Sequence, residues 1–377
     1  MKSEIDVLVV GAGIVGLATA AALARRGRSA IVLERREAIA RETTSRNSEV
    51  VHAGLYYPEG SLKARFCVEG RERLYARCAA LGLPHRALGK LVVAAEPAEL
   101  PALEALAQRA ERNGAPGLRL LSGTDAAKLE PHVRAVAALH SPRTGIVDAA
   151  AFALSYLAEA EAHGAALALR TELEALERSA AGWRASARSE EGEVAQLDVA
   201  AVVNAAGLGA DRVASLAGID VDAAGYRQHP CKGDWFALAP GAPLRFERLV
   251  YPLPGGAGLG VHVTLDLGGR VRFGPDAEYV DAPRYDVDPR KASAFAAAAG
   301  RYVPALRSEW LAPDSAGIRP KLSGPGEPFR DFVVAEESPR GLAGLVNLLG
   351  IESPGLTAAP AIAEHVATLL EETVLAR

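Results

Sequence analysis

The order of hydrophobic and polar residues near the N-terminus predicts a strand, a turn and a helix. Residues 7–10 are an apolar run of strand length, residues 11–16 (Gly-Ala-Gly-Ile-Val-Gly) form a glycine-rich turn, and residues 17–25 continue as a helix. A second apolar run at 29–33 predicts the next strand. Apart from Ser29, both runs are continuously apolar rather than alternating, which favours strands buried on both faces of a parallel sheet.

The middle of the chain adds mostly strands. A charged amphipathic helix is predicted over Leu62–Leu81, and a buried strand at 199–204 runs into a second glycine turn at Gly207. Three polar strands, joined by short loops, predict a β-meander at 166–177, 183–189 and 194–198. The other predicted strands are at 88–95, 135–139, 233–238, 249–252, 259–265 and 271–279, and the other predicted helices are at 97–112, 124–129, 149–163 and 289–303.

The C-terminal residues repeat the N-terminal pattern, with a strand at 345–349, a turn at 350–355 and a helix at 356–372. Similar elements at both ends, with sheet-rich stretches between them, predict a discontinuous first domain and an inserted second domain. The predicted fold class is therefore α/β (α+β overall), with a Rossmann-like domain that has a central parallel sheet and a three-stranded β-meander. The predicted bounds are 1–85, 143–225 and 317–377 for the first domain, and 86–142 and 226–316 for the sheet-rich domain.

Composition narrows the class of protein. The chain has 377 residues, which favours two domains, and 49% hydrophobic and 23% charged residues are ordinary for a globular protein. A formal net charge of -4 without a basic tract argues against nucleic acid as the main partner. Three scattered cysteines fit neither a disulfide framework nor a zinc cluster, so no metal site is predicted. With no transmembrane segment and no signal peptide expected, we predict a cytoplasmic protein that is at most peripheral to a membrane.

The glycine turn at 11–16 carries the first chemical prediction. Gly11 allows the tight turn, Gly13 lets a pyrophosphate approach the backbone, and Gly16 lets the helix pack on the strand. Glu34 ends the next strand about 20 residues later, where a carboxylate accepts hydrogen bonds from ribose hydroxyls. The same carboxylate disfavours a 2′-phosphate, so the pattern predicts a dinucleotide other than NADP.

Four segments together resemble one family: the N-terminal turn with Glu34, and residues 43–54, 204–211 and 350–357. They are similar to the FAD-dependent oxidoreductases of the D-amino-acid-oxidase/glycine-oxidase superfamily. Residues 52–67 are similar to its L-2-hydroxyglutarate dehydrogenase/oxidase branch. The resemblance implies non-covalently held FAD and oxidation of a small 2-hydroxy acid, L-2-hydroxyglutarate, to the 2-keto acid by hydride transfer.

The resemblance also implies which residues bind FAD. The turn before the last helix would lie near the part of the flavin that gains negative charge on reduction, and the backbone of Leu173 would meet the adenine. The implied set comprises Gly11, Gly13, Ile14, Val15, Gly16, Glu34, Arg35, Thr44, Ser45, Arg46, Asn47, Ser48, Leu173, Ala205, Ala206, Gly207, Arg319, Gly350, Ile351, Glu352, Ser353, Pro354, Gly355, Leu356 and Thr357.

Oxidation of a hydroxyl beside a carboxylate needs a base for the hydroxyl proton and cations for the carboxylate. His52 and His262 are the candidate bases, because imidazole titrates near neutral pH. Arg319 is the candidate carboxylate partner, through its two-pronged guanidinium. Lys321, Tyr251 and Lys232 are further candidates for the substrate site, Lys321 and Tyr251 as catalytic residues.

Two other functions stay open at this level. A glycine/sarcosine-type amine or amino-acid oxidase would also remove hydride from a carbon next to a carboxylate. A non-catalytic binding or escort protein could keep the same dinucleotide fold. The sequence does not name the electron acceptor, so oxygen, a quinone and a soluble carrier all remain open.

Overall fold

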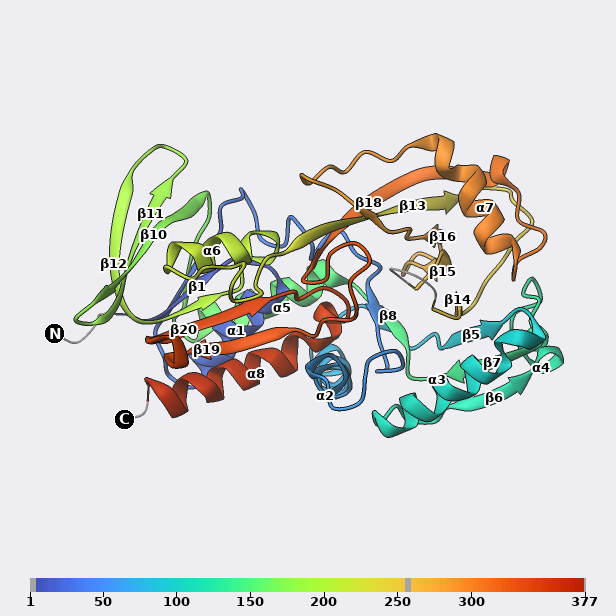
Figure 1. Ribbon diagram of the computed structural model, residues 1–377, viewed down its shortest axis with the longest axis horizontal. Coiled ribbons are helices and arrows are strands. Elements are labelled where there is room, and N and C mark those ends of the chain that lie inside the picture. The colour runs from blue at the N-terminus through green and yellow to red at the C-terminus, as the bar shows by residue number, and fades with distance from the viewer. Residues whose placement is uncertain (1–4, 255–258, 376–377) are drawn as a thin grey trace. The chain divides into compact units, whose positions relative to one another are not determined.

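An eight-stranded sheet organises the first of two units in the computed structural model, which describes residues 5–254 and 259–375 (Figure 1). This unit comprises Met1–Ser45, Ala149–His229 and Arg319–Arg377. Its parallel core pairs β20, β12, β1, β2 and β9 in that order, and β19 adds antiparallel to β20. The strands are β1 (Ile5–Val10), β2 (Ala30–Leu33), β9 (Ala166–Ala168), β10 (Thr171–Ser179), β11 (Gly182–Ser189), β12 (Val194–Asn204), β19 (Val333–Glu337) and β20 (Leu342–Leu349).

Strand β12 joins the two parts of this sheet. Its first half pairs antiparallel with β11, and its second half pairs in parallel with β1 on one side and β20 on the other. The predicted strands at 194–198 and 199–204 are therefore one continuous strand. The change from polar to apolar residues marks where β12 leaves the β-meander and enters the buried sheet.

Helix packing in this unit is centred on α1 (Ile14–Arg25), which contacts both α5 (Ala149–Ala162) and α8 (Gly355–Thr373). The helix is rich in alanine and buries nearly all of its side chains, so its neighbours can approach closely. Arg25 pairs with Glu159 of α5 at 2.8 Å. In Figure 1 α8, in red, runs alongside β19 and β20, which it also contacts. The short helix α6 (Ala210–Leu216) completes the set.

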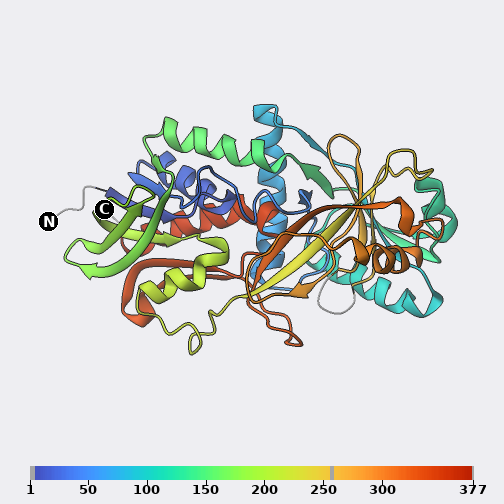
Figure 2. The same cartoon turned by 90° about the horizontal axis from the view of Figure 1, so that it is seen from above.

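A nine-stranded mixed sheet organises the second unit, Arg46–Asp148 and Pro230–Ile318. Its strand order is β17-β13-β16-β15-β14-β5-β7-β6, and β18 pairs with β13; Figure 2 shows these two long strands side by side. The β5–β14 pair, which joins the two halves of this order, is parallel, whereas the β13–β16, β13–β17, β14–β15, β15–β16, β5–β7 and β6–β7 pairs are antiparallel. The strands are β5 (Lys90–Ala94), β6 (Arg119–Ser122), β7 (Ala137–Ser141), β13 (His229–Leu238), β14 (Leu249–Pro252), β15 (His262–Leu265), β16 (Val271–Gly274), β17 (Glu278–Tyr279) and β18 (Leu311–Lys321).

A small three-stranded sheet lies in the same unit, with order β3-β8-β4. Aromatic and branched side chains between the large sheet and α7 form the core of the unit, among them Phe236 and Phe295, whose ring centroids are 4.7 Å apart. The remaining elements are β3 (Val50–Val51), β4 (His85–Arg86), β8 (Gly145–Val147), α2 (Leu62–Leu81), α3 (Leu100–Arg112), α4 (Gly123–Leu129) and α7 (Ala292–Gly300).

Several features differ from the predictions. Residues 46–85, including α2, and residues 143–148 belong to the second unit rather than to the first. Strands β6 and β19 were not predicted. The long strand β18 was not predicted, because residues 311–321 contain two prolines and several polar residues and show no alternation. Pairing with β13 stabilises this strand, although its local sequence does not favour strand formation.

Among the described residues, none of the helices is both long enough and apolar enough to cross a membrane. Residues 1–4, on which part of the signal-peptide interpretation rested, lie outside the described residues.

Candidate functional site

The glycine turn after β1 has the geometry that its sequence predicts. Gly11 has a φ of +105°, and a Cβ there would overlap the backbone of Ala205. A Cβ on Gly16 would overlap the carbonyl oxygen of Gly11, so this position also requires glycine. A Cβ on Gly13 would instead come 3.2 Å from Oγ1 of Thr44, with no backbone in the way. Glycine at position 13 therefore keeps the outer surface of the turn open.

Two side chains hold this turn against its neighbours. The Glu34 carboxylate accepts hydrogen bonds from the backbone N–H of Ala12 at 2.9 Å and from that of Arg36 at 2.8 Å. The hydroxyl oxygen of Thr44 accepts the N–H of Ile14, the first residue of α1, at 3.0 Å. The bonds to Ala12 and Ile14 satisfy backbone donors at the N-terminus of α1, where anionic groups are favoured.

A cleft opens above this turn. Of the predicted cofactor residues it is lined by Gly11, Gly13, Glu34, Arg35, Thr44, Leu173, Ala205, Ala206 and Gly207. The sequence interpretation missed the lining residues Val10, Leu33, Ala40, Arg41, Glu42, Thr43, Thr171, Glu172, Gly209, Arg212 and Val213. Most of these are chain neighbours of residues that were predicted, so widening each motif by two or three residues would have included them.

The residues that line this cleft fit a dinucleotide. A glycine turn at a helix N-terminus suits a pyrophosphate, and the Glu34 carboxylate at the end of β2 suits ribose hydroxyls. Leu173 begins a β-bulge in β10 at the edge of the cleft, which leaves the backbone there irregular. The donor set therefore agrees with the adenosine and pyrophosphate portion of FAD.

Several other predicted cofactor residues have local roles. The Ser45 hydroxyl donates to the carbonyl of Glu42 at 3.2 Å, Asn47 accepts the N–H of Glu49 at 2.7 Å, and the Arg46 guanidinium lies 4.2 Å from the Tyr285 ring centroid. Ile14, Val15 and Gly16 lie in the first turn of α1, and Ser48 precedes β3. Gly350, Ile351, Glu352, Ser353 and Pro354 form the turn after β20, while Gly355, Leu356 and Thr357 begin α8.

A second group of candidate residues gathers inside the second unit, around the ring of Tyr251 on β14. The His262 ring stacks on it, with centroids 3.6 Å apart and planes at 18°. The Nζ atom of Lys90 lies 3.9 Å from the Tyr251 ring centroid and 5.2 Å from that of Tyr56. All except the partly buried Tyr56 are buried, and burial raises the pKa of both phenols. Lys90 was missed as a site residue.

The two predicted histidine bases both belong to this aromatic cluster, which we define as His52, Tyr56, Lys90, Tyr251 and His262. Nδ1 of His262 faces the carbonyl oxygen of Gly260 at 2.9 Å, so it carries a proton, and in the neutral ring Nε2 carries the lone pair. His52 is buried, and burial, with smaller contributions from Lys90 and His262, holds its pKa well below its usual value. The structure thus brings together three of the five predicted catalytic residues.

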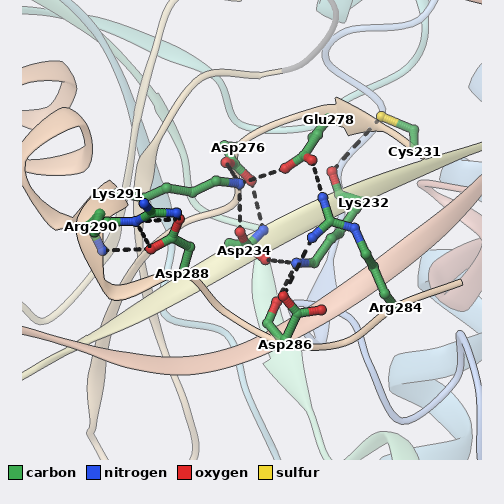
Figure 3. A network of polar contacts seen from close by, with 10 residues as sticks. All are labelled: Cys231, Lys232, Asp234, Asp276, Glu278, Arg284, Asp286, Asp288, Arg290 and Lys291. Atoms are coloured by element: carbon green, nitrogen blue, oxygen red, sulfur yellow. Dashed lines mark hydrogen bonds and ion pairs between the residues drawn. The ribbon is translucent and has the colours of Figure 1, made fainter.

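Lys232 has a different environment (Figure 3). Its ammonium pairs with the buried Asp234 at 3.0 Å and donates to the backbone carbonyl of Asp286. Asp234 also binds Lys291 at 2.6 Å, and Lys291 in turn binds Asp276 and Glu278. We call these five residues, Lys232, Asp234, Asp276, Glu278 and Lys291, the paired network. Each charged group of the paired network has at least one oppositely charged partner, which does not favour a substrate role for Lys232.

The other two predicted catalytic residues, Arg319 and Lys321, are at the end of β18 and belong to the first unit. Both are partly buried. Their predicted roles toward a carboxylate stay predictions.

Comparison with known proteins supports the interpretation of this cleft as an FAD-binding site. The sequence matches the FAD dependent oxidoreductase (DAO) family over residues 6–369. It is 42% identical over 408 residues to the mitochondrial L-2-hydroxyglutarate dehydrogenase of Arabidopsis thaliana, covering 97% of this chain and 83% of that protein. The corresponding human protein is 37% identical over 286 residues, covering 73% of this chain and 61% of that protein.

A solved structure, dithionite-reduced L-alpha-glycerophosphate oxidase from Mycoplasma pneumoniae with FAD bound, superposes with a TM-score of 0.86. It is 27% identical and covers 97% of this chain and 94% of that chain. The predicted α/β fold class, the family resemblance and the FAD cofactor are confirmed by these matches.

One prediction is overturned. The cytoplasmic location inferred from the N-terminal residues is wrong by this comparison, because both matched dehydrogenases are mitochondrial proteins by name. Over nearly its whole length, from residue 6 to residue 369, the chain belongs to the FAD dependent oxidoreductase family.

Proposed function

We propose that the protein oxidises L-2-hydroxyglutarate, or a 2-hydroxy acid very close to it, to the 2-keto acid. This proposal rests mainly on the 42% identity to a plant L-2-hydroxyglutarate dehydrogenase across 97% of this chain. The aromatic cluster supports it, because the second unit holds two buried imidazoles beside a buried amine. Such groups suit an acid substrate that must lose a hydroxyl proton.

The first unit would hold the cofactor. Glu34 would accept hydrogen bonds from the adenosine ribose, and the open surface at Gly13 would receive the pyrophosphate. FAD, when bound, supplies the acceptor for the hydride that leaves the carbon bearing the hydroxyl.

The chain's own task in the reaction is to remove a proton. As the C–H bond breaks and C=O forms, the O–H proton goes to an imidazole of the aromatic cluster. His262 is suited to this because its Nδ1–H is directed to Gly260, which leaves the Nε2 lone pair as the acceptor. His52 is suited because its lowered pKa keeps it neutral at pH 7. Arg319 stays our proposed partner for a substrate carboxylate, through its planar fork.

Anaerobic bleaching of the flavin tests the substrate assignment without any choice of electron acceptor. We expect L-2-hydroxyglutarate to bleach the holoenzyme, whereas glycine, sarcosine and proline should not. Bleaching by an amine, with none by any 2-hydroxy acid, would replace the proposal with the amine-oxidase function. Purified holoenzyme that no member of either panel reduces would favour a binding protein.

Stopped-flow reduction of His52→Asn and His262→Asn then identifies the base. Loss of the base should slow reduction by about 100-fold or more. The other variant should mainly weaken substrate binding. If His52 is the base, its low pKa predicts that reduction holds its rate to a pH well below the usual histidine range. Near wild-type rates in both variants would remove both imidazoles from the chemistry.

A further inference from the structure

Lys90 is the most unusual charged side chain of the second unit. It begins β5, its exposed fraction is 0%, and its Nζ has no hydrogen-bond partner among the residues that the structure describes. Its Nζ lies over the faces of the Tyr251 and Tyr56 rings. Burying an ammonium without an anion is costly, and cation–π contacts recover only part of that cost.

The groups around Lys90 come from several elements, and none supplies a carboxylate ion pair within the described residues. Cys67 approaches from α2, and burial raises the pKa of its thiol to about 12, so it stays neutral. His52 and His262 are imidazoles that share the cluster, and Tyr56 and Tyr251 are phenols. Arg272, on β16, adds positive rather than negative charge near Tyr251.

The amine and the imidazole of His262 lie on opposite faces of the Tyr251 ring. A ring stacked at 3.6 Å and an ammonium at 3.9 Å from one centroid cannot share a face without overlapping. A ligand that contacts the imidazole with one group and the amine with another must therefore pass around the edge of this ring. A chain of several bonds between a hydroxyl and a second anionic group can make this passage.

We propose that Lys90 is the receptor for the distal carboxylate of a 2-hydroxy dicarboxylic acid, and so sets the preference for dicarboxylate over monocarboxylate substrates. This inference rests on the proposed function. It assigns the buried amine a ligand that supplies the missing negative charge, and it makes Lys90 a determinant of specificity rather than of the chemical step.

Burial also predicts a protonation change. It lowers the pKa of Lys90 to about 7, so at pH 8 the amine of the free protein is largely neutral. A carboxylate beside it favours the ammonium, and binding should then take up close to one proton. A ligand without the distal carboxylate should take up none at this position.

The test compares Lys90→Met with wild-type holoenzyme on two acids of equal chain length, L-2-hydroxyglutarate and L-2-hydroxyvalerate. For the dicarboxylate we expect kcat/KM to fall about 10- to 150-fold, which corresponds to one charged hydrogen bond. For the monocarboxylate we expect a change within about threefold. Lys128→Met, an exposed lysine paired with Asp125, is the matched control and should leave both values unchanged.

A binding measurement tests the same point without turnover. Calorimetry of glutarate and pentanoate binding at pH 8, in two buffers of different ionisation enthalpy, should show proton uptake only for glutarate with wild type. Lys90→Met should lose both the uptake and the preference for glutarate. Lys90→Gln serves as a second variant if Lys90→Met fails to retain FAD.

The outcomes separate the two proposals. Wild type that binds glutarate through Lys90 but oxidises no 2-hydroxy acid would overturn the proposed function and keep the receptor. Wild type that oxidises L-2-hydroxyglutarate while Lys90→Met keeps the full preference for it would overturn the receptor. An equal loss with both acids would make Lys90 part of the chemical step, which also overturns it.

Discussion

Two buried lysines of the same nine-stranded sheet have opposite surroundings. Lys232 on β13 is 1% exposed and lies 3.0 Å from Asp234, which a second lysine also binds (Figure 3). Lys90 on β5 is 0% exposed, and its Nζ lies over the rings of Tyr251 and Tyr56. The first charge is balanced inside the protein, whereas the second is balanced by nothing among the described residues. The comparison shows that burial alone does not distinguish a structural lysine from one that awaits a ligand.

The difference follows from the energetics of buried charge. A buried ion pair retains its stability only while both partners are present, because either one alone leaves an uncompensated charge. An isolated buried amine instead releases its proton, which is why the pKa of Lys90 falls to about 7. The paired network keeps Lys291 charged, since its three carboxylates raise its pKa. These two behaviours give opposite responses to mutation.

The largest expected effect comes from breaking the paired network. Asp234→Asn removes the charge that binds both Lys232 and Lys291 while keeping the side-chain shape. We expect the free energy of unfolding to fall by about 3–5 kcal/mol, as for loss of one partner of a buried pair. Denaturant titration of the variant against wild type measures it.

The matched control is Asp222→Asn, which breaks the exposed pair with Arg227 in the first unit. It should cost no more than about 1 kcal/mol. If both variants lose the same small amount, the paired network does not stabilise the fold and the contrast with Lys90 disappears.

An intermediate effect is expected from the pH dependence of Lys90→Met. The folded protein releases the Lys90 proton near pH 7, whereas the unfolded chain holds it to about pH 10.4. Between these values the unfolded state binds more protons, so wild-type stability rises with pH by up to about 1.4 kcal/mol per unit from this group. Lys90→Met should lack this contribution, so any stability advantage it has at pH 7 should shrink toward pH 9. Parallel stability curves for the two proteins would show that Lys90 is not buried as an amine.

Much of the first unit could be predicted from its sequence because the signals are local. The apolar run of β1, the glycine turn and Glu34 all lie within about 30 residues. In the second unit, the charged amphipathic helix α2 likewise has the predicted bounds, Leu62–Leu81. The turn needs glycine at Gly11 and Gly16 for steric reasons that any chain with this fold shares. Local chemistry of this kind is visible without a structure.

The aromatic cluster could be predicted only in part, because its members meet across long stretches of chain. His52, Tyr251 and His262 were chosen by residue type, but Lys90 has no local signal that separates it from a solvated lysine. Its burial depends on the parallel pairing of β5 with β14, about 160 residues later, which places Tyr251 beside it. The pairing of Lys232 with Asp234 spans only two residues, yet its link to Lys291 also requires the fold.

Glu130 gives the smallest expected effect and sharpens the comparison, because its charge is only partly balanced. Its carboxylate accepts the N–H groups of Glu247 at 3.1 Å and Arg248 at 2.7 Å, and the Arg248 guanidinium is 3.7 Å away. Burial outweighs these contacts and raises its pKa from 4.5 to about 7. Between these pH values the folded state binds more protons, so this group lowers stability as pH rises. Glu130→Gln keeps an oxygen for both N–H groups and removes the charge, so it should gain about 2–3 kcal/mol on wild type between pH 5 and pH 8. Thermal unfolding at the two pH values measures this difference. A difference that stays constant would mean that Glu130 is ionised throughout and is balanced as fully as Lys232.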